Sequence, residues 1–164
     1  QTRQMFLETF ERIRENFRGM FTEVFGGGKA DLRVVDEGDV LESGIDIVAR
    51  PPGKRVLALP LLSGGERSLT AAALILAILK VSPPPFCILD EVDAALDEAN
   101  VDRFRAALRD AAQDTQFIVI THNRGTIEAA DTIYGISMGA DNTSQTLSLK
   151  LNGRELAPAS AVEG

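Results

Sequence analysis

The sequence has a single cysteine and no long hydrophobic run. Because Cys87 has no second cysteine to pair with, an internal disulfide is excluded, and a reducing compartment suits the chain best. The longest apolar stretch, residues 69–79, is too short to span a bilayer. The first residues lack the small-residue cleavage pattern of a signal peptide. We therefore expect a soluble, cytoplasmic protein with no membrane contact, in which Cys87 is an inert core residue.

The sequence has few positive charges, because it contains 17 lysines and arginines but 24 aspartates and glutamates, which gives a formal net charge of -7. This balance argues against a broad basic surface for nucleic acid, although a local basic patch stays open. What the chain does have is a globular composition, because 45% of its 164 residues are hydrophobic. This length is enough for one domain with its own core.

The first segment predicts an amphipathic helix over residues 2–25. Its apolar residues follow a heptad seam formed by Phe6, Phe10, Ile13, Phe17, Met20 and Val24. The seam is shorter than three heptads, so two interpretations stay open. The helix is either the end of a coiled coil or an amphipathic helix that packs on its own domain. Three consecutive glycines, residues 26–28, end it.

The middle of the chain predicts antiparallel β structure. Short strand-like segments fall at residues 30–35, 44–49 and 56–59. A turn formed by Pro51, Pro52 and Gly53 separates the last two segments.

After residue 63, helices alternate with apolar strands. The predicted helices are 66–80, 98–112 and 124–130, and the predicted strands are 86–89, 117–120 and 132–137. This alternation indicates an α/β fold with a buried, mainly parallel sheet and flanking helices. We also expect an edge strand at 147–151 and a disordered tail at 157–164.

The segment Ser63-Gly64-Gly65-Glu66 precedes the first of these helices. A serine followed three residues later by glutamate is a capping box, which by itself explains the pair. A capping box does not need two glycines, however, and glycines let a phosphate approach backbone amides closely. The helix start adds a favourable dipole and free N–H donors. The segment is therefore both a helix cap and a candidate phosphate site.

Asp90 and Glu91 close the apolar strand that begins at Phe86. Open α/β sheets bind ligands at the carboxyl ends of their strands. A carboxylate at that edge can hold magnesium beside substrate phosphates, and a second one can orient an attacking water. The alternative is a polar turn, where acids are common.

Two further residues are candidates. Asp97 is a candidate N-cap of the helix that follows it. His122, the only histidine, follows the strand at 117–120. A lone histidine is usually structural, but one at a strand end beside a phosphate site can donate a hydrogen bond to a phosphate oxygen.

The sequence lacks a phosphate-binding P-loop. Such a loop needs Gly-Lys followed by Ser or Thr, between a buried strand and a helix. The two Gly-Lys pairs are followed by Ala30 and Arg55, which carry no hydroxyl. The chain thus has only part of a nucleotide site.

Taken in order, residues 62–66, 89–91, 95–97 and 121–122 resemble the signature, Walker B, D-loop and switch motifs of an ABC-type ATPase. More narrowly, the chain resembles the C-terminal head segment of a bacterial SMC (structural maintenance of chromosomes) protein. The resemblance covers about residues 5–150. Its supporting stretches are the glycine-rich segment at 25–30, residues 42–47 and the Pro-Pro-Gly-Lys segment at 51–54.

The resemblance implies an architecture and a set of partners. Residues 1–25 would end a returning coiled coil, and residues 26–156 would form the C-lobe of an ATPase head. In this family an N-terminal lobe supplies the P-loop, and two heads enclose two ATP molecules with Mg²⁺. A kleisin subunit and chromosomal DNA complete the assembly. The implied function is chromosome condensation and segregation at the nucleoid, and the implied partners are an N-lobe, a second head as homodimer, a kleisin and DNA.

The resemblance also implies a role for each candidate residue. Asp90 matches the magnesium-site aspartate, Glu91 the catalytic glutamate that activates water, and His122 the switch histidine. These three would act on the nucleotide of their own head.

The signature residues would act on the partner head instead. Ser63, Gly64 and Gly65 match the residues that contact the γ-phosphate of ATP held by the partner. Asp97 matches the D-loop aspartate near the dimer interface. Because the P-loop is missing, we expect the chain alone not to hydrolyse ATP.

Two alternatives stay open at this point. One is an interaction module that docks a kleisin, with the antiparallel segment at 30–60 as a candidate surface through edge pairing. The other is the equivalent lobe of a DNA-repair ATPase of the same superfamily.

Overall fold

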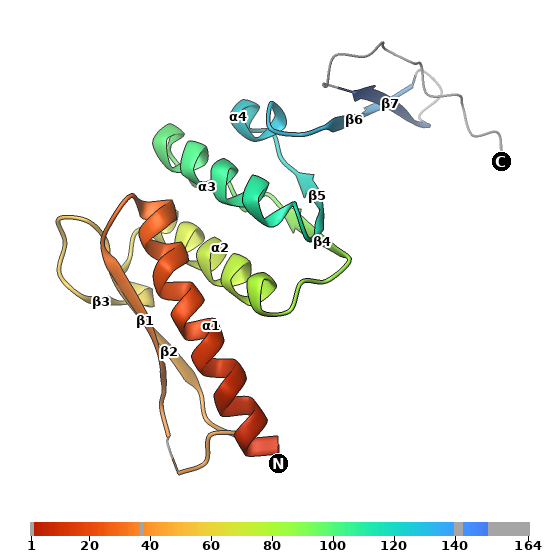
Figure 1. Cartoon of the computed structure of the whole chain (residues 1–164). Coiled ribbons are helices and arrows are strands. Elements are labelled where there is room, and N and C mark those ends of the chain that lie inside the picture. The colour runs from red at the N-terminus through yellow and green to blue at the C-terminus, as the bar shows by residue number, and fades with distance from the viewer. Residues whose placement is uncertain (1, 37, 140–142, 151–164) are drawn as a thin grey trace.

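The structure, a computed structural model, describes residues 2–36, 38–139 and 143–150 (Figure 1). The predicted tail at 157–164 lies outside the described residues, as does the last residue of the predicted edge strand. Within the described ranges, no helix is both long and apolar enough to cross a membrane.

Helix α1 (Thr2–Phe25) has the predicted bounds. It packs against a second helix, α2 (Gly64–Val81), and against the first strand of the chain. Burial deepens toward its C-terminal end, where Phe17, Phe21 and Val24 are fully buried. In the described chain α1 is therefore an amphipathic helix packed on its own domain, whereas a coiled-coil role stays a prediction.

Glycine ends α1 as predicted, because Gly26, Gly27 and Gly28 all have positive φ angles. At Gly28 (φ 81°) a Cβ atom would lie 2.4 Å from the carbonyl oxygen of Arg50. The chain can thus turn directly from α1 into the adjoining sheet only without a side chain at this position.

That sheet is antiparallel, as expected, with the order β1-β2-β3. Its strands are β1 (Lys29–Val34), β2 (Ile45–Arg50) and the short β3 (Leu57–Ala58). Alternate residues of β1 and β2, including Ala30, Leu32 and Ala49, enter the core formed with α1 and α2. A short 3-10 helix, η1 (Leu59–Leu61), leads from β3 to α2.

The α/β part consists of β4 (Phe86–Asp90), α3 (Glu98–Ala111) and β5 (Gln116–Ile120). The two strands pair in parallel, with Asp90 opposite Ile120, so the predicted βαβ unit is confirmed. Leu89 is buried with the core residues of α2 and α3. This side of the strand pair is therefore the covered one.

The mainly parallel sheet is not what the described residues form. After α4 (Arg124–Ile127), β6 (Thr132–Met138) pairs antiparallel with β7 (Ser144–Lys150). A parallel partner needs a long crossover, usually a helix, whereas a short connection produces a hairpin. In the described ranges β4 and β5, joined through α3, are the one parallel pair, whereas β6 and β7 pair antiparallel.

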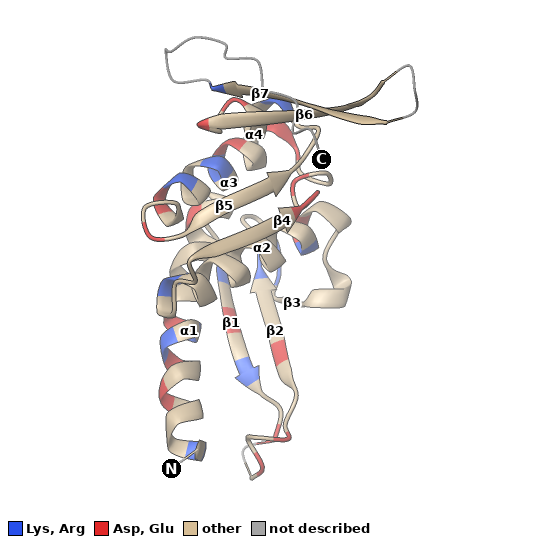
Figure 2. Cartoon of the chain, turned by 90° about the vertical axis from the view of Figure 1, so that its right-hand side faces the viewer, with Lys and Arg blue, Asp and Glu red and all other residues tan. Residues whose placement is uncertain are grey.

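The outer face of β4 and β5 is apolar and open. Figure 2 shows the two strands side by side with no helix in front of them. Phe86, Ile88, Ile118 and Ile120 are between 48% and 57% exposed on this pair. The sequence pattern predicted strands buried on both faces, but the described chain covers only one.

Candidate functional site

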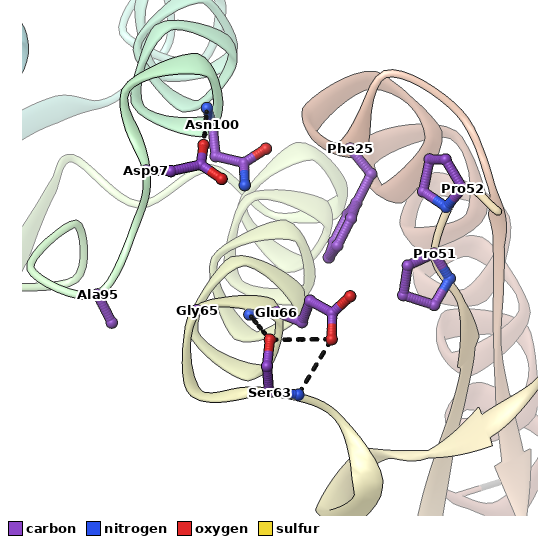
Figure 3. A pocket seen from close by; sticks show the side chains of 9 residues that line it. All are labelled: Phe25, Pro51, Pro52, Ser63, Gly65, Glu66, Ala95, Asp97 and Asn100. Atoms are coloured by element: carbon purple, nitrogen blue, oxygen red, sulfur yellow. Dashed lines mark hydrogen bonds between the residues drawn. The ribbon is translucent and has the colours of Figure 1, made fainter. Parts of the chain in front are cut away.

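The start of α2 forms the predicted capping box. Ser63 has an extended backbone, and its Oγ accepts a hydrogen bond from the Glu66 amide at 3.3 Å. The Glu66 Oε2 atom accepts hydrogen bonds from the Ser63 amide at 3.0 Å and from the Ser63 hydroxyl at 2.9 Å. The carboxylate therefore holds both polar groups of Ser63 (Figure 3).

Glu66 also accepts a contact that the sequence did not predict. Lys54 Nζ lies 2.8 Å from Glu66 Oε1, on the side of the carboxylate that Ser63 does not use. The hydrogen bond from Lys54 is the main cause that lowers the pKa of Glu66, with the hydrogen bonds from Ser63 adding to it and burial opposing it. Glu66 is thus held as an ionised, paired carboxylate.

The two glycines of this segment have different surroundings. A Cβ atom on Gly65 would lie 2.6 Å from the carbonyl oxygen of Ala95, so Gly65 lets the loop after β4 approach the start of α2. A Cβ atom on Gly64 would meet nothing within 4 Å. The chain itself therefore requires glycine only at Gly65, and the open space at Gly64 leaves the helix start accessible from outside.

A cavity of about 430 Å³ lies where these segments meet (Figure 3). It is lined by the end of α1, the proline turn, the start of α2, the loop after β4 and the start of α3, through Phe25, Pro51, Pro52, Ser63, Gly65, Glu66, Ala95, Asp97 and Asn100. Asp97 caps α3 as predicted, because its side chain accepts a hydrogen bond from the Asn100 amide at 2.8 Å. The fold thus brings the signature-like residues and Asp97 around one cavity.

Asp90, Glu91 and His122 lie elsewhere, at the carboxyl ends of β4 and β5. None of the three lines the cavity. Glu91 Oε1 is 3.7 Å from His122 Nδ1, and both side chains are more than 60% exposed. The predicted catalytic pair is therefore adjacent in space and open to an external group.

Glu91 has an unusual backbone, because its φ of 48° is the only positive value at a non-glycine residue in the described chain. Its amide donates to the Ile120 carbonyl oxygen at 2.9 Å, which extends the parallel pairing by one residue. A left-handed conformation at a non-glycine residue costs free energy and is often found at functional sites. Here it accompanies a side chain that is 62% exposed.

The acids at this edge fit a magnesium ion only in part. Asp90 and Glu91 supply carboxylate oxygens, the ligands that Mg²⁺ prefers. No cluster of three or more metal-ligating side chains forms in the part of the chain that the structure describes. A magnesium ion at Asp90 would therefore take its other ligands from water or from substrate phosphates.

Sequence reasoning missed Asp93, the most buried acid at this edge, which is 1% exposed. Both of its oxygens accept hydrogen bonds from the Thr121 hydroxyl, at 2.9 and 2.8 Å, and one also accepts from Thr126. Asp93 therefore ties the loop after β4 to the residue that precedes His122. The third acid of Asp-Glu-Val-Asp was the available signal.

Comparisons with known proteins identify the family. The family model described as the RecF/RecN/SMC N terminal domain matches residues 9–145. The chain is 56% identical over 146 residues to the chromosome partition protein Smc of Bacillus subtilis, covering 89% of this chain and 12% of that protein. It is 49% identical over 152 residues to the Smc of Desulfitobacterium hafniense, covering 93% and 13%. The chain thus spans about one eighth of the length of these relatives.

Solved structures agree. A crystal structure of an Smc head bound to the C-winged helix domain of ScpA matches with a TM-score of 0.85 and 41% identity, covering 92% of this chain and 46% of that one. A structure from work on ATP-driven dimerization and DNA-stimulated activation of SMC ATPases matches with a TM-score of 0.79 and 40% identity, covering 90% and 89%. The chain therefore belongs to the RecF/RecN/SMC family and has the α/β fold of an SMC head domain.

Proposed function

We propose that the chain is the C-terminal lobe of an SMC head. With an N-terminal lobe and a second head it would complete ATP-binding and hydrolysis sites that drive chromosome condensation and segregation. The observation that carries this proposal is the open apolar face of β4 and β5 beside Glu91 and His122. Parallel strands are normally covered on both faces, so a further lobe is expected against this one.

The covering lobe would bring the missing P-loop. Asp90 would hold Mg²⁺, which when bound neutralises charge on the phosphates. Glu91 would accept the proton of the attacking water, and His122 would donate a hydrogen bond toward the γ-phosphate. The exposure of Glu91 and His122 supports this assignment, because both side chains are free to reach a nucleotide held by another lobe.

Ser63, Gly64 and Gly65 would serve the nucleotide of the second head. The free amides at the start of α2 and the open space at Gly64 suit a phosphate that approaches from outside. The separation of the cavity residues from Asp90, Glu91 and His122 supports two different ATP molecules. Asp97 would lie near the dimer interface, and α1 would be the root of the returning coiled coil.

ATP turnover tests the catalytic assignment. The chain alone is expected to show no hydrolysis above background, whereas the complete head with its P-loop lobe hydrolyses ATP. In that head Glu91→Gln should lower turnover by about 10²–10⁴-fold, since it removes the general base. Glu128→Gln, at an exposed acid just after α4, is the matched control. Normal turnover in Glu91→Gln would exclude Glu91 as the base.

Head engagement tests the signature assignment. Ser63→Arg should block ATP-dependent dimerisation and leave ATP binding by the P-loop lobe unchanged, because the added side chain fills the approach to α2. Ser82→Arg, at the exposed C-cap of the same helix, is the control. Undiminished dimerisation of Ser63→Arg by size-exclusion chromatography with ATP would refute the trans contact.

A second function, kleisin docking, is favoured by the solved neighbours. Two of these are Smc heads bound to C-terminal parts of ScpA. We propose that this chain also carries a docking surface of this kind, with the unpaired edge of β1 as one candidate. A kleisin C-terminal domain should then bind the chain without nucleotide, and absence of binding to a folded sample would count against it. The similarity to solved SMC heads also favours the lobe of an SMC head over the equivalent lobe of a DNA-repair ATPase.

A further inference from the structure

The proposed function assigns no role to the Pro-Pro-Gly-Lys segment at residues 51–54. The structure gives it a fixed shape, because the Lys54 amide donates to the Pro51 carbonyl oxygen at 3.1 Å and Gly53 has a φ of 74°. Pro51 is buried against the body of the domain. The turn therefore directs the Lys54 side chain toward the start of α2, where its ammonium contacts Glu66.

The two carboxylate oxygens of Glu66 contact different residues. Oε1 faces Lys54 at 2.8 Å, and Oε2 holds the amide and hydroxyl of Ser63. The contacts form a short relay from Lys54 through Glu66 to Ser63. The Glu66 side chain is only 16% exposed, so water screens its charge poorly.

This relay bears on anion binding in two ways. An unpaired carboxylate at the start of α2 would repel a phosphate that approaches the same helix end. The Ser63 hydroxyl also points its proton at Glu66, so it must turn away from that carboxylate before it can donate to a phosphate oxygen. A cation on the other oxygen reduces both obstacles.

We propose that Lys54 is a positioning residue for ATP-dependent head engagement. It compensates the charge of Glu66 and orients its carboxylate, so that the Ser63 hydroxyl and the α2 amides can donate hydrogen bonds to the γ-phosphate of the partner's ATP. This inference rests on the signature function proposed above. The lowered pKa of Glu66, caused first by Lys54, is consistent with it.

The test uses the complete head in a Glu91→Gln background, so that hydrolysis does not dissolve the dimer. Lys54→Met removes the charge and keeps the aliphatic stem. It should weaken ATP-dependent dimerisation about tenfold, the effect of losing one charged hydrogen bond, with ATP binding by the P-loop lobe unchanged. Lys54→Arg should keep most of the dimerisation. Arg55→Met removes the same charge one residue away and should have no effect.

A second background separates this relay from any other effect of Lys54. Glu66→Gln removes the charge but can still form a capping box. In that background Lys54→Met should change dimerisation less than about twofold, because no carboxylate is left to compensate. A tenfold loss that persists with Glu66→Gln, or no loss in the original background, would overturn the inference. Thermal melting of each variant reports whether the fold is retained.

Ser63→Arg, measured in the same assay, distinguishes the two levels of proposal. If Ser63→Arg abolishes dimerisation while Lys54→Met leaves it intact, the signature function stands and the Lys54 relay is wrong. If Ser63→Arg also leaves dimerisation intact, the signature function itself fails, and the relay fails with it.

Discussion

The two ends of the domain use apolar residues in opposite ways. In the N-terminal half, Phe17 and Phe21 of α1 are fully buried against α2 and the antiparallel sheet. In the C-terminal half, apolar residues of similar size on β4, β5 and β6, such as Ile88 and Ile136, remain more than half exposed. The core extends from α1 through α2 to α3, whereas the outer face of β4 and β5 lacks a covering layer within the described chain. Contiguous exposed apolar surface of this kind marks an interaction site.

The charges follow the same division. In the N-terminal half, Asp31 of β1 binds Arg14 and Arg18 of α1 at 2.7 and 2.8 Å, which fixes the helix on the sheet. In the C-terminal half, Asp90 makes no ion pair with any described residue, and Glu91 has only the long contact to His122. The acids that the proposed chemistry needs are thus the ones that the fold leaves available.

The largest expected effect tests the closed core. Phe21→Ala should lower the free energy of unfolding by about 3–5 kcal/mol, because it removes a fully buried ring that stacks on Phe25 at 4.1 Å. Phe86→Ala makes the same change on the open face, where the ring is 55% exposed, and should cost less than about 1 kcal/mol. Urea denaturation of both variants measures the difference. Equal losses would mean that the two halves are packed alike.

A smaller effect is expected within the C-terminal half, where Asp93 links the loop after β4 to residues that follow β5. Asp93→Ala should cost about 1–3 kcal/mol, because it leaves the Thr121 hydroxyl and the buried Thr126 hydroxyl without their acceptor. It should also lower ATP turnover of the complete head, since Thr121 precedes His122. Asp114→Ala, at an exposed acid after α3, is the control for stability. An Asp93→Ala variant with the stability and ATP turnover of the parent would show that the hydrogen bonds of Asp93 with Thr121 and Thr126 contribute to neither.

Local patterns carried most of what could be predicted. The bounds of α1, the capping box at Ser63 and the cap at Asp97 follow from spacing and residue type within a few positions. The parallel pairing of β4 and β5 followed from the strand-helix-strand order. These features depend on neighbours in sequence, which is why one sequence is enough to recognise them.

What could not be predicted depends on contacts between distant segments. No local pattern pairs the arginines of α1 with β1, yet Arg14 and Arg18 both contact Asp31 there. The contact of Lys54 with Glu66 and that of Gly65 with Ala95 likewise need the folded chain. The apolar sequence of the strand at 86–89 is compatible with burial of one face or of both faces. Periodicity reports which residues avoid water, and it does not say which molecule covers them.

The ion pair of the closed half should appear in the pH dependence of stability. The hydrogen bond from Arg14 and the contact with Arg18 lower the pKa of Asp31 from its ordinary 3.8 to about 2. Folding therefore favours the ionised form, so this contribution is complete above about pH 4 and is lost as the pH falls toward 2.

Asp31→Asn should accordingly cost about 1 kcal/mol at pH 7, a value that allows for partial solvent screening. The stability difference between variant and parent should shrink as the pH falls from about 4 toward 2. Denaturation at pH 7, 4 and 3 measures it, with the exposed Asp39→Asn as control. A difference that stayed constant across these pH values would exclude the ion pair as its source.

The smallest effect on the stability of the isolated chain is expected for a substitution on the open face of β4 and β5. Ile118→Ser should change the stability of the isolated chain by no more than about 0.5 kcal/mol, because the side chain is already half exposed. If a P-loop lobe covers β4 and β5, the same change places a hydroxyl against an apolar layer and should weaken lobe association at least tenfold. Val35→Ser, at an exposed residue of the N-terminal half, should change neither the stability nor the lobe association.

Titration of a purified N-terminal lobe onto each variant measures the affinity of lobe association directly. Unchanged association of Ile118→Ser would mean that this face is not covered by that lobe, and the contrast between the two halves would need another partner to explain it.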